Sequence, residues 1–169
     1  MPVRVRAGIV IVQDGRILLV NHRRMGRSYW VLPGGALNAG EALAACAARE
    51  VREETGLEVL VDRFLYLAEA FSKDGGRHSV DVIFLGRLAD EGRSPQAMAG
   101  WAIERPEFVP LKDLPGLTLL PPIAGEILED AAANFAGPPR HLGNRWSEMG
   151  VADDRDIPRR AGSSPPAGR

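Results

Sequence analysis

The residues with the clearest capacity for chemistry are glutamates, five of which fall between positions 41 and 58. Placed on a helix at roughly 100° per residue, Glu50, Glu53 and Glu54 share one arc of about 100°. Like charges at these spacings repel one another, so an isolated helix gains nothing from the clustering. The cluster is either a solvated acidic face or a site for a divalent cation, because ions such as Mg²⁺ bind clustered carboxylate oxygens and cancel their repulsion.

A glycine-containing loop precedes these glutamates, in the order Leu32-Pro33-Gly34-Gly35. Gly34 and Gly35 can bring backbone N–H groups close to a ligand, and a helix N-terminus favours negative charge. A Gly-Gly pair alone is usually only a turn. Followed by three carboxylates that can bind a metal, it indicates a site for a metal-bound phosphate ester or anhydride, with Gly34 and Gly35 as substrate-binding candidates.

The helix that carries the carboxylates is expected over residues 41–55, which are strong helix formers without internal Gly or Pro. Gly56 is expected to end it. The opposite face of this helix is predicted to be a stripe of small side chains packed closely against a sheet, namely Ala44, Ala48, Val51 and Thr55. Such close packing would hold the carboxylates at a defined depth beside the preceding loop.

The segments around this helix favour strands. Residue type and alternation predict a hairpin turn at Asp14-Gly15 and strands at residues 3–12, 16–20, 30–32, 57–71, 78–88 and 107–111. Loops are expected at 21–29, which holds three arginines, and at 89–100. A second helix with one apolar stripe is expected at 122–135. This order of strands, helix, strands and helix predicts a mixed α+β domain.

The C-terminal segment has a different composition. Residues 137–169 are rich in Pro, Gly and Arg and contain few large apolar side chains, so they bury too little surface to offset their ordering entropy alone. We therefore predict a domain at 1–136 and a partly disordered arm at 137–169. We hypothesise that Trp146 docks on the domain or on a second subunit, which would give a homodimer, with Arg140 or Arg145 near the substrate cleft.

The overall composition excludes several classes of protein. Lys and Arg total 21 against 22 Asp and Glu, a net charge of −1 that argues against a nucleic-acid partner. The sequence contains no run of 18 apolar residues and no apolar secretory segment at its start, so no membrane partner is expected. The single cysteine, Cys46, excludes an intramolecular disulfide and fits the reducing cytoplasm, where we expect the protein to reside.

The spacing of these residues resembles the Nudix box, the signature of the Nudix hydrolase family to which MutT-like proteins belong. Gly35 is followed after five residues by Glu41, and seven residues later by the run Arg49-Glu50-Val51-Arg52-Glu53-Glu54-Thr55-Gly56-Leu57, which agrees with the box at every defined position. The resemblance covers roughly residues 3–135. It implies an α/β/α sandwich with a mixed sheet and leaves the C-terminal arm outside.

The resemblance also implies an activity and a role for each residue of the box. The activity is hydrolysis, dependent on Mg²⁺ or Mn²⁺, of the phosphoanhydride bond of a nucleoside diphosphate linked to another moiety. Glu50 and Glu54 would be the principal metal ligands, and Glu53 a further ligand or the residue that orients or deprotonates the attacking water. Arg49 would form an orienting salt bridge with Glu53, and Glu41 would have a structural role.

Charged residues outside the box extend the set of candidates. Arg23, Arg24 and Arg27 precede the box and could bind phosphate oxygens with two parallel hydrogen bonds, although arginines are also common in surface loops. Many family members use one additional acidic residue outside the box. Glu104 and Glu107 are the local candidates for it, the alternative being that they are exposed loop glutamates.

The signatures of substrate subclasses do not select one substrate. The ADP-ribose class tends to carry a proline where Ser72 and Lys73 stand here, and the dinucleoside-polyphosphate class a tyrosine where Asp74 stands. A nucleoside triphosphate and an ADP-ribose-like compound both remain open as substrates. The alternative function is a catalytically weak nucleotide-sensing or binding module on the same fold. That alternative predicts loss of the box glutamates, all of which are present.

Overall fold

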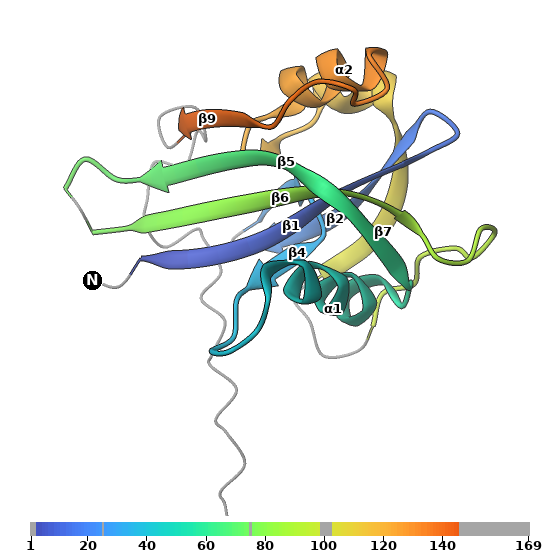
Figure 1. Ribbon diagram of the computed structural model, residues 1–169, viewed down its shortest axis with the longest axis horizontal. Helices are drawn as coiled ribbons and strands as arrows, with labels where there is room; N and C mark the ends of the chain where they lie inside the picture. Colours follow the sequence, from blue (N-terminus) through green and yellow to red (C-terminus); the bar gives the residue numbers. More distant parts are fainter. Residues whose placement is uncertain (1–2, 25, 75, 99–102, 146–169) are drawn as a thin grey trace, which may run out of the picture.

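The protein, described here by a computed structural model, is defined over residues 3–24, 26–74, 76–98 and 103–145. Its sheet lies between two helices, α1 (Leu43–Thr55) and α2 (Ala124–Ala132), which cover opposite faces (Figure 1). The predicted α+β sandwich is therefore confirmed. Across the described ranges, no helix is long and apolar enough to cross a membrane.

The sheet is mixed, as predicted. Its order is β8-β3-β2-β1-β6-β5-β9, with β4 paired to β1 and β7 paired to β2. The β1–β6, β3–β8 and β5–β9 pairs are parallel and the other pairs are antiparallel. The strands of the described residues are β1 (Arg4–Gln13), β2 (Arg16–Arg24), β3 (Arg27–Val31), β4 (Gly34–Ala36), β5 (Val59–Phe71), β6 (His78–Leu88), β7 (Ile103–Pro110), β8 (Leu119–Leu120) and β9 (Arg140–Asn144).

The first two connections show one correct prediction and one error. Asp14 and Gly15 have φ values of 50° and 70°, the positive values that a type I′ hairpin turn requires, and β1 and β2 pair across them. The loop predicted at 21–29 is wrong, because β2 continues to Arg24 and β3 begins at Arg27. The arginines that suggested a loop belong to the outer end of a hairpin, where a strand tolerates charge at exposed positions.

The strand predicted at 107–111 is also longer and placed earlier than expected. β7 starts at Ile103 and pairs with β2, and a 3₁₀ helix, η1 (Leu111–Gly116), follows it. Glu104 and Glu107 therefore lie in a strand and not in a loop. The backbone ladder with β2 holds residues 104–107 extended, although Glu and Pro have little strand preference.

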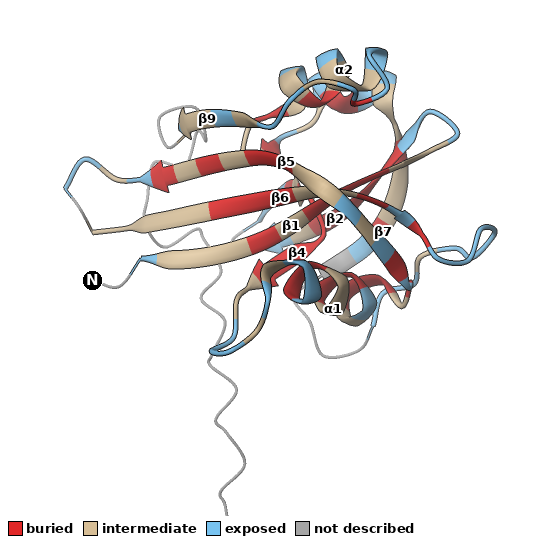
Figure 2. Cartoon of the chain, viewed as in Figure 1, coloured by how far each residue is buried: buried red, intermediate tan, exposed pale blue. Residues whose placement is uncertain are grey.

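Two apolar clusters fill the spaces on either side of the sheet (Figure 2). Side chains of β1 alternate between them, since Ile9 and Ile11 face α1 whereas Val10 faces α2. The cluster under α2 contains Val10, Ile17, Leu19, Leu32, Leu65, Tyr66, Ile83, Val109, Leu114, Leu119, Ile123, Ile127 and Phe135. The cluster under α1 contains Ala7, Ile9, Ile11, Leu18, Cys46, Ala47, Val51, Leu57, Val59 and Leu88.

The beginning of the predicted arm joins the sheet as β9, parallel to β5. Arg140 lies 2.9 Å from Glu129, and Arg145 donates to Glu126, so both arginines bind α2. The hypothesis that one of them lies near the substrate cleft is therefore not supported. Trp146 and all later residues lie outside the described part of the chain, so the docking of Trp146 and the division into domain and arm stay predictions.

Candidate functional site

The helix α1 differs from its prediction in its start and in its buried face. It begins at Leu43, so Glu41 lies in the loop before it. Ala44 is exposed, so the predicted stripe is wrong for this residue, whereas Ala48 is half-buried and packs against the cluster under α1. The buried residues of the helix are Cys46, Ala47, Glu50, Val51, Glu54 and Thr55. Two of the three candidate carboxylates thus share the buried face with the small side chains.

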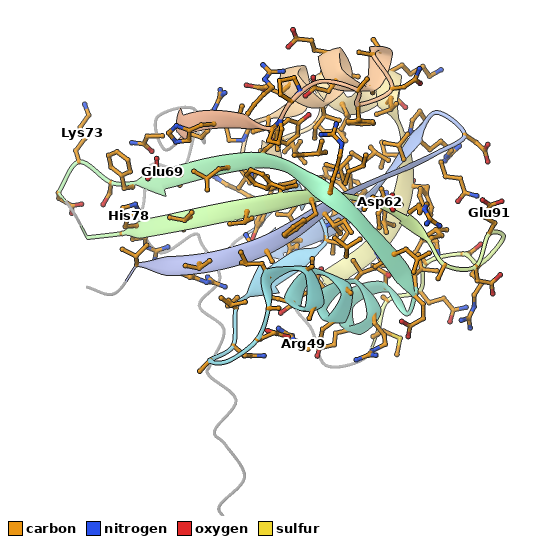
Figure 3. All side chains as sticks on the ribbon, in the orientation of Figure 1. Arg49, Asp62, Glu69, Lys73, His78 and Glu91 are labelled. Carbon is orange, nitrogen blue, oxygen red and sulfur yellow. The ribbon has the colours of Figure 1, made fainter. Side chains whose placement is uncertain are left out.

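Arg49 is the centre of an ion-pair network on this helix (labelled in Figure 3). Its Nε and Nη2 atoms donate to the two oxygens of Glu41, at 2.7 and 2.9 Å. Its Nη1 atom donates to Glu50 at 2.8 Å and to Glu53 at 3.2 Å. The hydrogen bonds from Arg49 are the main reason that the pKa of Glu41 falls to about 2. One guanidinium therefore offsets the mutual repulsion of the carboxylates.

Glu50 is fully buried and lies directly against Gly35 of β4. A Cβ atom on Gly35 would lie 2.3 Å from the Cδ atom of the Glu50 carboxylate and 2.3 Å from its Oε1 atom. Such distances are far below van der Waals contact, so a side chain at position 35 would displace the carboxylate. The glycine is required here by the close approach of a charged group.

Glu54 is held by the neighbouring glycine. It is 3% exposed, and its Oε2 atom accepts a hydrogen bond from the Gly34 N–H at 3.0 Å. Gly34 has a φ of 150°, and a Cβ there would lie 2.3 Å from the carbonyl oxygen of Ala7 and 2.6 Å from the Cα of Gly8. The two glycines of β4 therefore each contact one buried carboxylate: Gly35 leaves space for Glu50, and the Gly34 N–H donates a hydrogen bond to Glu54.

The donor set fits a divalent cation in its chemistry. Glu50, Glu53 and Glu54 supply carboxylate oxygens, which Mg²⁺ and Mn²⁺ prefer, and Gly35 gives room for one of these carboxylates beside β4. In the arrangement seen, no three His, Cys, Asp or Glu side chains of the described residues converge closely enough to hold a metal ion. A cation would therefore compete with Arg49 for Glu50 and Glu53.

Cys46 packs beneath the same network as a small, fully buried side chain. Its Sγ atom lies 3.5 Å from the carbonyl oxygen of Ala36, to which it donates. Burial, aided by the negative charges of Glu41 and Glu50, raises the pKa of the Cys46 thiol to about 11. The thiol therefore stays protonated at neutral pH.

The remaining candidates lie on other strands. Arg23 is an exposed residue of β2, next to Arg24, of which only the backbone is described. Glu107, in β7, forms a 3.0 Å ion pair with Arg105, and only the backbone of Glu104 is described. Arg27 begins β3, opposite Arg24. The structure thus gathers the candidates of α1 and β4 at one place, whereas the candidate arginines and the two glutamates outside the box lie on the paired strands β2, β3 and β7. Their roles stay predictions.

The sequence prediction omits two charged residues that touch this site. Arg6 of β1 donates from Nη2 to the Gly34 carbonyl at 3.1 Å, and its Nη1 atom lies 3.7 Å from Asp81 of β6. Burial raises the pKa of Asp81, although the positive charge of Arg6 opposes the rise. In the sequence, Arg6 and Asp81 are each a charged residue within an apolar strand, which marks them as unusual. That they are partners follows only from the parallel register of β1 and β6.

Comparison with known proteins identifies the family to which this site belongs. The family model described as the NUDIX domain matches residues 2–131, which include β4, α1 and all the box residues. The chain belongs to the NUDIX family. The matched residues end within α2, so β9 lies beyond them.

Two curated relatives illustrate the range of similarity within the NUDIX family. A MutT-like protein of Streptomyces ambofaciens is 48% identical over 56 residues, which are 33% of this chain and 35% of the relative. An ADP-ribose pyrophosphatase of Methanocaldococcus jannaschii is 28% identical over 109 residues, 64% of this chain and 62% of the relative. Each match therefore spans less than two thirds of the relative's length.

Solved structures confirm the NUDIX fold. A NUDIX hydrolase from Nitrosomonas europaea superposes with a TM-score of 0.64 at 25% identity, covering 79% of this chain and 90% of that chain. An ADP-ribose pyrophosphatase from Streptococcus suis gives a TM-score of 0.62 at 25% identity, covering 83% and 98%. The sandwich with its mixed sheet is thus the architecture shared with these proteins.

Proposed function

We propose that this NUDIX protein hydrolyses the phosphoanhydride bond of a nucleoside diphosphate linked to another moiety, with Mg²⁺ or Mn²⁺ as cofactor. The observation that carries the proposal is that Glu50, Glu53 and Glu54 occupy one turn of α1 beside the glycines of β4. The two ADP-ribose pyrophosphatases among the similar proteins support this substrate class. A nucleoside triphosphate and an ADP-ribose-like diphosphate both fit the proposal.

Metal binding, proton transfer and charge compensation would fall to different residues of the site. Glu50 and Glu54 would hold the cation, with Glu53 as a further ligand or as the base. When bound, the cation supplies charge that neutralises the phosphate oxygens and lowers the pKa of a water molecule. Arg49 balances the carboxylate charges before substrate binds, and Glu41 holds the guanidinium with two hydrogen bonds.

Glu53 is the residue best placed to exchange a proton with water. A third of its side chain is exposed, whereas Glu50 and Glu54 are buried. Arg49 donates to its Oε2 atom, which limits the rotation of the carboxylate. We therefore assign Oε1 of Glu53 as the atom that accepts a proton from the attacking water, and Arg49 as the residue that orients it.

The test is a panel of nucleoside triphosphates and nucleoside diphosphate derivatives, assayed with and without Mg²⁺ or Mn²⁺, with separation of the products. We expect cleavage of at least one compound, only in the presence of metal. The variant Glu54→Gln keeps an acceptor oxygen for the Gly34 N–H but loses the charge. We expect turnover to fall at least about a hundredfold, or about 2.7 kcal/mol of transition-state stabilisation.

Glu58→Gln is the matched control, because Glu58 lies just beyond α1 with 57% of its side chain exposed. We expect wild-type turnover from this variant. Near-normal turnover by folded Glu54→Gln at saturating metal would contradict the proposed roles. Nucleotide binding without turnover by the wild-type protein would contradict hydrolysis and favour the sensing module.

We also propose, from the charge balance and the single cysteine, that the protein acts on free nucleotides in the cytoplasm and does not bind nucleic acid. A homodimer covering Trp146 is a separate proposal. Sedimentation of the full chain would test it, and a monomer at every accessible concentration would contradict it.

A further inference from the structure

Two buried polar residues outside α1 have no part in the chemistry proposed above. Asn21 of β2 and Asp81 of β6 are 5% and 9% exposed. Apart from tyrosines, the other buried polar or charged side chains of the described ranges are Glu50, Glu54 and Thr55, all on α1. Burying a polar group costs free energy unless hydrogen bonds compensate it, so the partners of Asn21 and Asp81 matter.

Asn21 and Asp81 continue the face of the sheet that carries the apolar cluster under α2. Asn21 follows Leu19 of that cluster by two residues on β2, and Asp81 precedes Ile83 by two residues on β6. Side chains two residues apart in a strand point to the same face of the sheet. Both steps lead away from the turn between β1 and β2, because β6 runs parallel to β1. The two polar residues therefore lie beyond the same end of the cluster.

This end of the cluster adjoins the glycines of β4. Arg6, the register partner of Asp81 on β1, donates from Nη2 to the Gly34 carbonyl at 3.1 Å. The Gly34 N–H donates to Glu54 at 3.0 Å. Arg6 is thus separated from Glu54 by a single residue, so one nucleotide can reach both groups.

The polar groups at this end hold hydrogen-bonding capacity that the described residues leave unused. The Ser28 hydroxyl donates to Oδ1 of Asn21 at 3.0 Å, but Nδ2 of this amide has no partner among the residues described. Nε of Arg6 is buried and likewise lacks a partner within the described part of the chain. The Asp81 oxygens lie 3.7 Å from Nη1 of Arg6 and 3.5 Å from the Ser79 hydroxyl, which are long contacts. Two donors and one carboxylate are therefore available to a ligand.

Trp30 adds an aromatic surface to the same end. It pairs with Asn21 across β2 and β3, packs against the α2 cluster and remains partly exposed. The guanidinium carbon of Arg105 lies 5.8 Å from the centre of its ring. Because the Arg105 side chain is 65% exposed, it can give way to a flat ring that stacks on the indole. A nucleobase is such a ring, whereas a sugar is not.

We propose that Asn21, Asp81 and Trp30 form the subsite for the nucleobase of the substrate, with Trp30 stacking on the base and the two polar side chains binding its edge. The inference rests on the proposed function in taking a nucleotide as the ligand. The edges of nucleobases carry both donors and acceptors, which match the Asn21 amide, Nε of Arg6 and the Asp81 carboxylate. Arg6 and Asp81 together carry no net charge, which suits an uncharged base better than a phosphate.

The test is the binding of adenosine, guanosine, cytidine and uridine 5′-monophosphates to the full chain, measured by isothermal titration calorimetry without divalent metal. Ribose 5-phosphate, which has no base, is the comparison compound. We expect the wild type to bind at least one nucleotide at least about tenfold more tightly than ribose 5-phosphate. Equal affinity for all of these compounds would overturn the base subsite.

Two variants remove the polar groups and keep most of the side-chain volume: Asn21→Leu removes the amide, and Asp81→Asn removes the charge. We expect each to bind the preferred nucleotide at least about tenfold more weakly, or about 1.4 kcal/mol, with unchanged affinity for ribose 5-phosphate. Ser28→Ala is the matched control, because it removes the bond to Oδ1 of Asn21 and leaves Nδ2 in place. This control should keep the wild-type affinities. Asp81→Asn is isosteric, so it carries the test if Asn21→Leu fails to fold.

The outcomes separate this inference from the proposed function. A loss confined to nucleotides in the folded variants, with Ser28→Ala unchanged, supports the subsite. Wild-type affinities in these variants, an equal loss for ribose 5-phosphate, or the same loss in Ser28→Ala overturns it. Base-dependent binding without metal-dependent cleavage overturns the proposed hydrolysis and leaves the subsite standing, whereas cleavage with no contribution of the base to binding does the reverse.

Discussion

The two helices cover opposite faces of one sheet with different kinds of side chain. Under α2 most contacts are apolar, and Leu114, Ile123 and Ile127 are all fully buried. On α1 the helix's own buried apolar side chains are small, namely Cys46, Ala47 and Val51, and they share its buried face with the carboxylates of Glu50 and Glu54. Figure 2 shows buried segments on both faces of the sheet. The two faces therefore differ in the type of side chain that is buried and not in whether a helix covers them.

This difference assigns separate tasks to the two layers. Burial of apolar area provides roughly 25 cal/mol per Å² of stabilisation, and in the α2 layer the charged groups, such as Glu126 with Arg145 and Asp130 with Arg140, are paired beside the apolar cluster and none is fully buried. The α1 layer must compensate two buried carboxylates, and it does so with Arg49 and the Gly34 N–H. We therefore expect substitutions under α2 to change stability and substitutions around α1 to change activity.

The largest effect on stability is expected from Ile127→Ala in the α2 layer. Removing a fully buried side chain leaves a cavity and costs about 2–5 kcal/mol of unfolding free energy. Denaturant unfolding would measure this loss, and the kcat of the folded variant should be unchanged. Leu60→Ala is the control, because Leu60 is 44% exposed and should cost little. A fall in kcat as large as that of Glu54→Gln would break the division of tasks.

An intermediate effect is expected from Arg49 in the α1 layer. Arg49→Ala frees Glu53 to rotate and should lower kcat about tenfold, or about 1.4 kcal/mol. Arg49→Lys should restore only part of the activity, because an ammonium cannot reproduce the two parallel bonds to Glu41.

Arg52→Ala is the control for the Arg49 variants. Arg52 lies on the same helix, 59% exposed, in a loose 3.9 Å pair with Glu58. Full activity in Arg49→Lys would show that the positive charge alone suffices and that the fork geometry is not needed.

The effect expected to be smallest on activity comes from Glu41→Gln, and it appears as a pH dependence of stability. Its folded pKa of about 2 lies below the ordinary value of 4.5, so ionised Glu41 stabilises the fold above pH 4.5. This contribution is lost as the pH falls through about 2, and the glutamine variant lacks it throughout. Unfolding free energies measured between pH 6 and pH 2 should therefore converge for the two proteins as the pH falls. A constant difference would rule out this linkage.

Local signals predicted much of the fold. The Asp14-Gly15 turn, the strand at 78–88 and the end of the helix at Gly56 depend on backbone preferences of a few neighbouring residues, and they agree with the structure. The prediction failed where long-range pairing decides. β9 has a composition that argues against order, yet it pairs with β5 and its arginines bind α2.

For the candidate site, the sequence predicted which residues lie close together, but it did not predict that Glu50 and Glu54 lie on the buried face of α1. Helical spacing placed the buried face opposite the glutamates, yet Ala44 is exposed and the buried face includes Glu50 and Glu54. Arg49 of the same helix and the Gly34 N–H of β4 compensate these two carboxylates, and the second contact depends on a residue outside the helix. The contact of Arg6 with Gly34 likewise required the register of three strands.

The environment of Cys46 has a practical consequence for labelling. Maleimides and iodoacetamides react with the thiolate form of cysteine, and this buried thiol, with a pKa near 11, presents almost none of it at neutral pH. Because the chain has no other cysteine, one introduced at an exposed site such as Arg87 could carry a spin label or fluorophore by itself. The native protein can thus serve as its own unlabelled background, with no need to replace a side chain packed beneath the carboxylates.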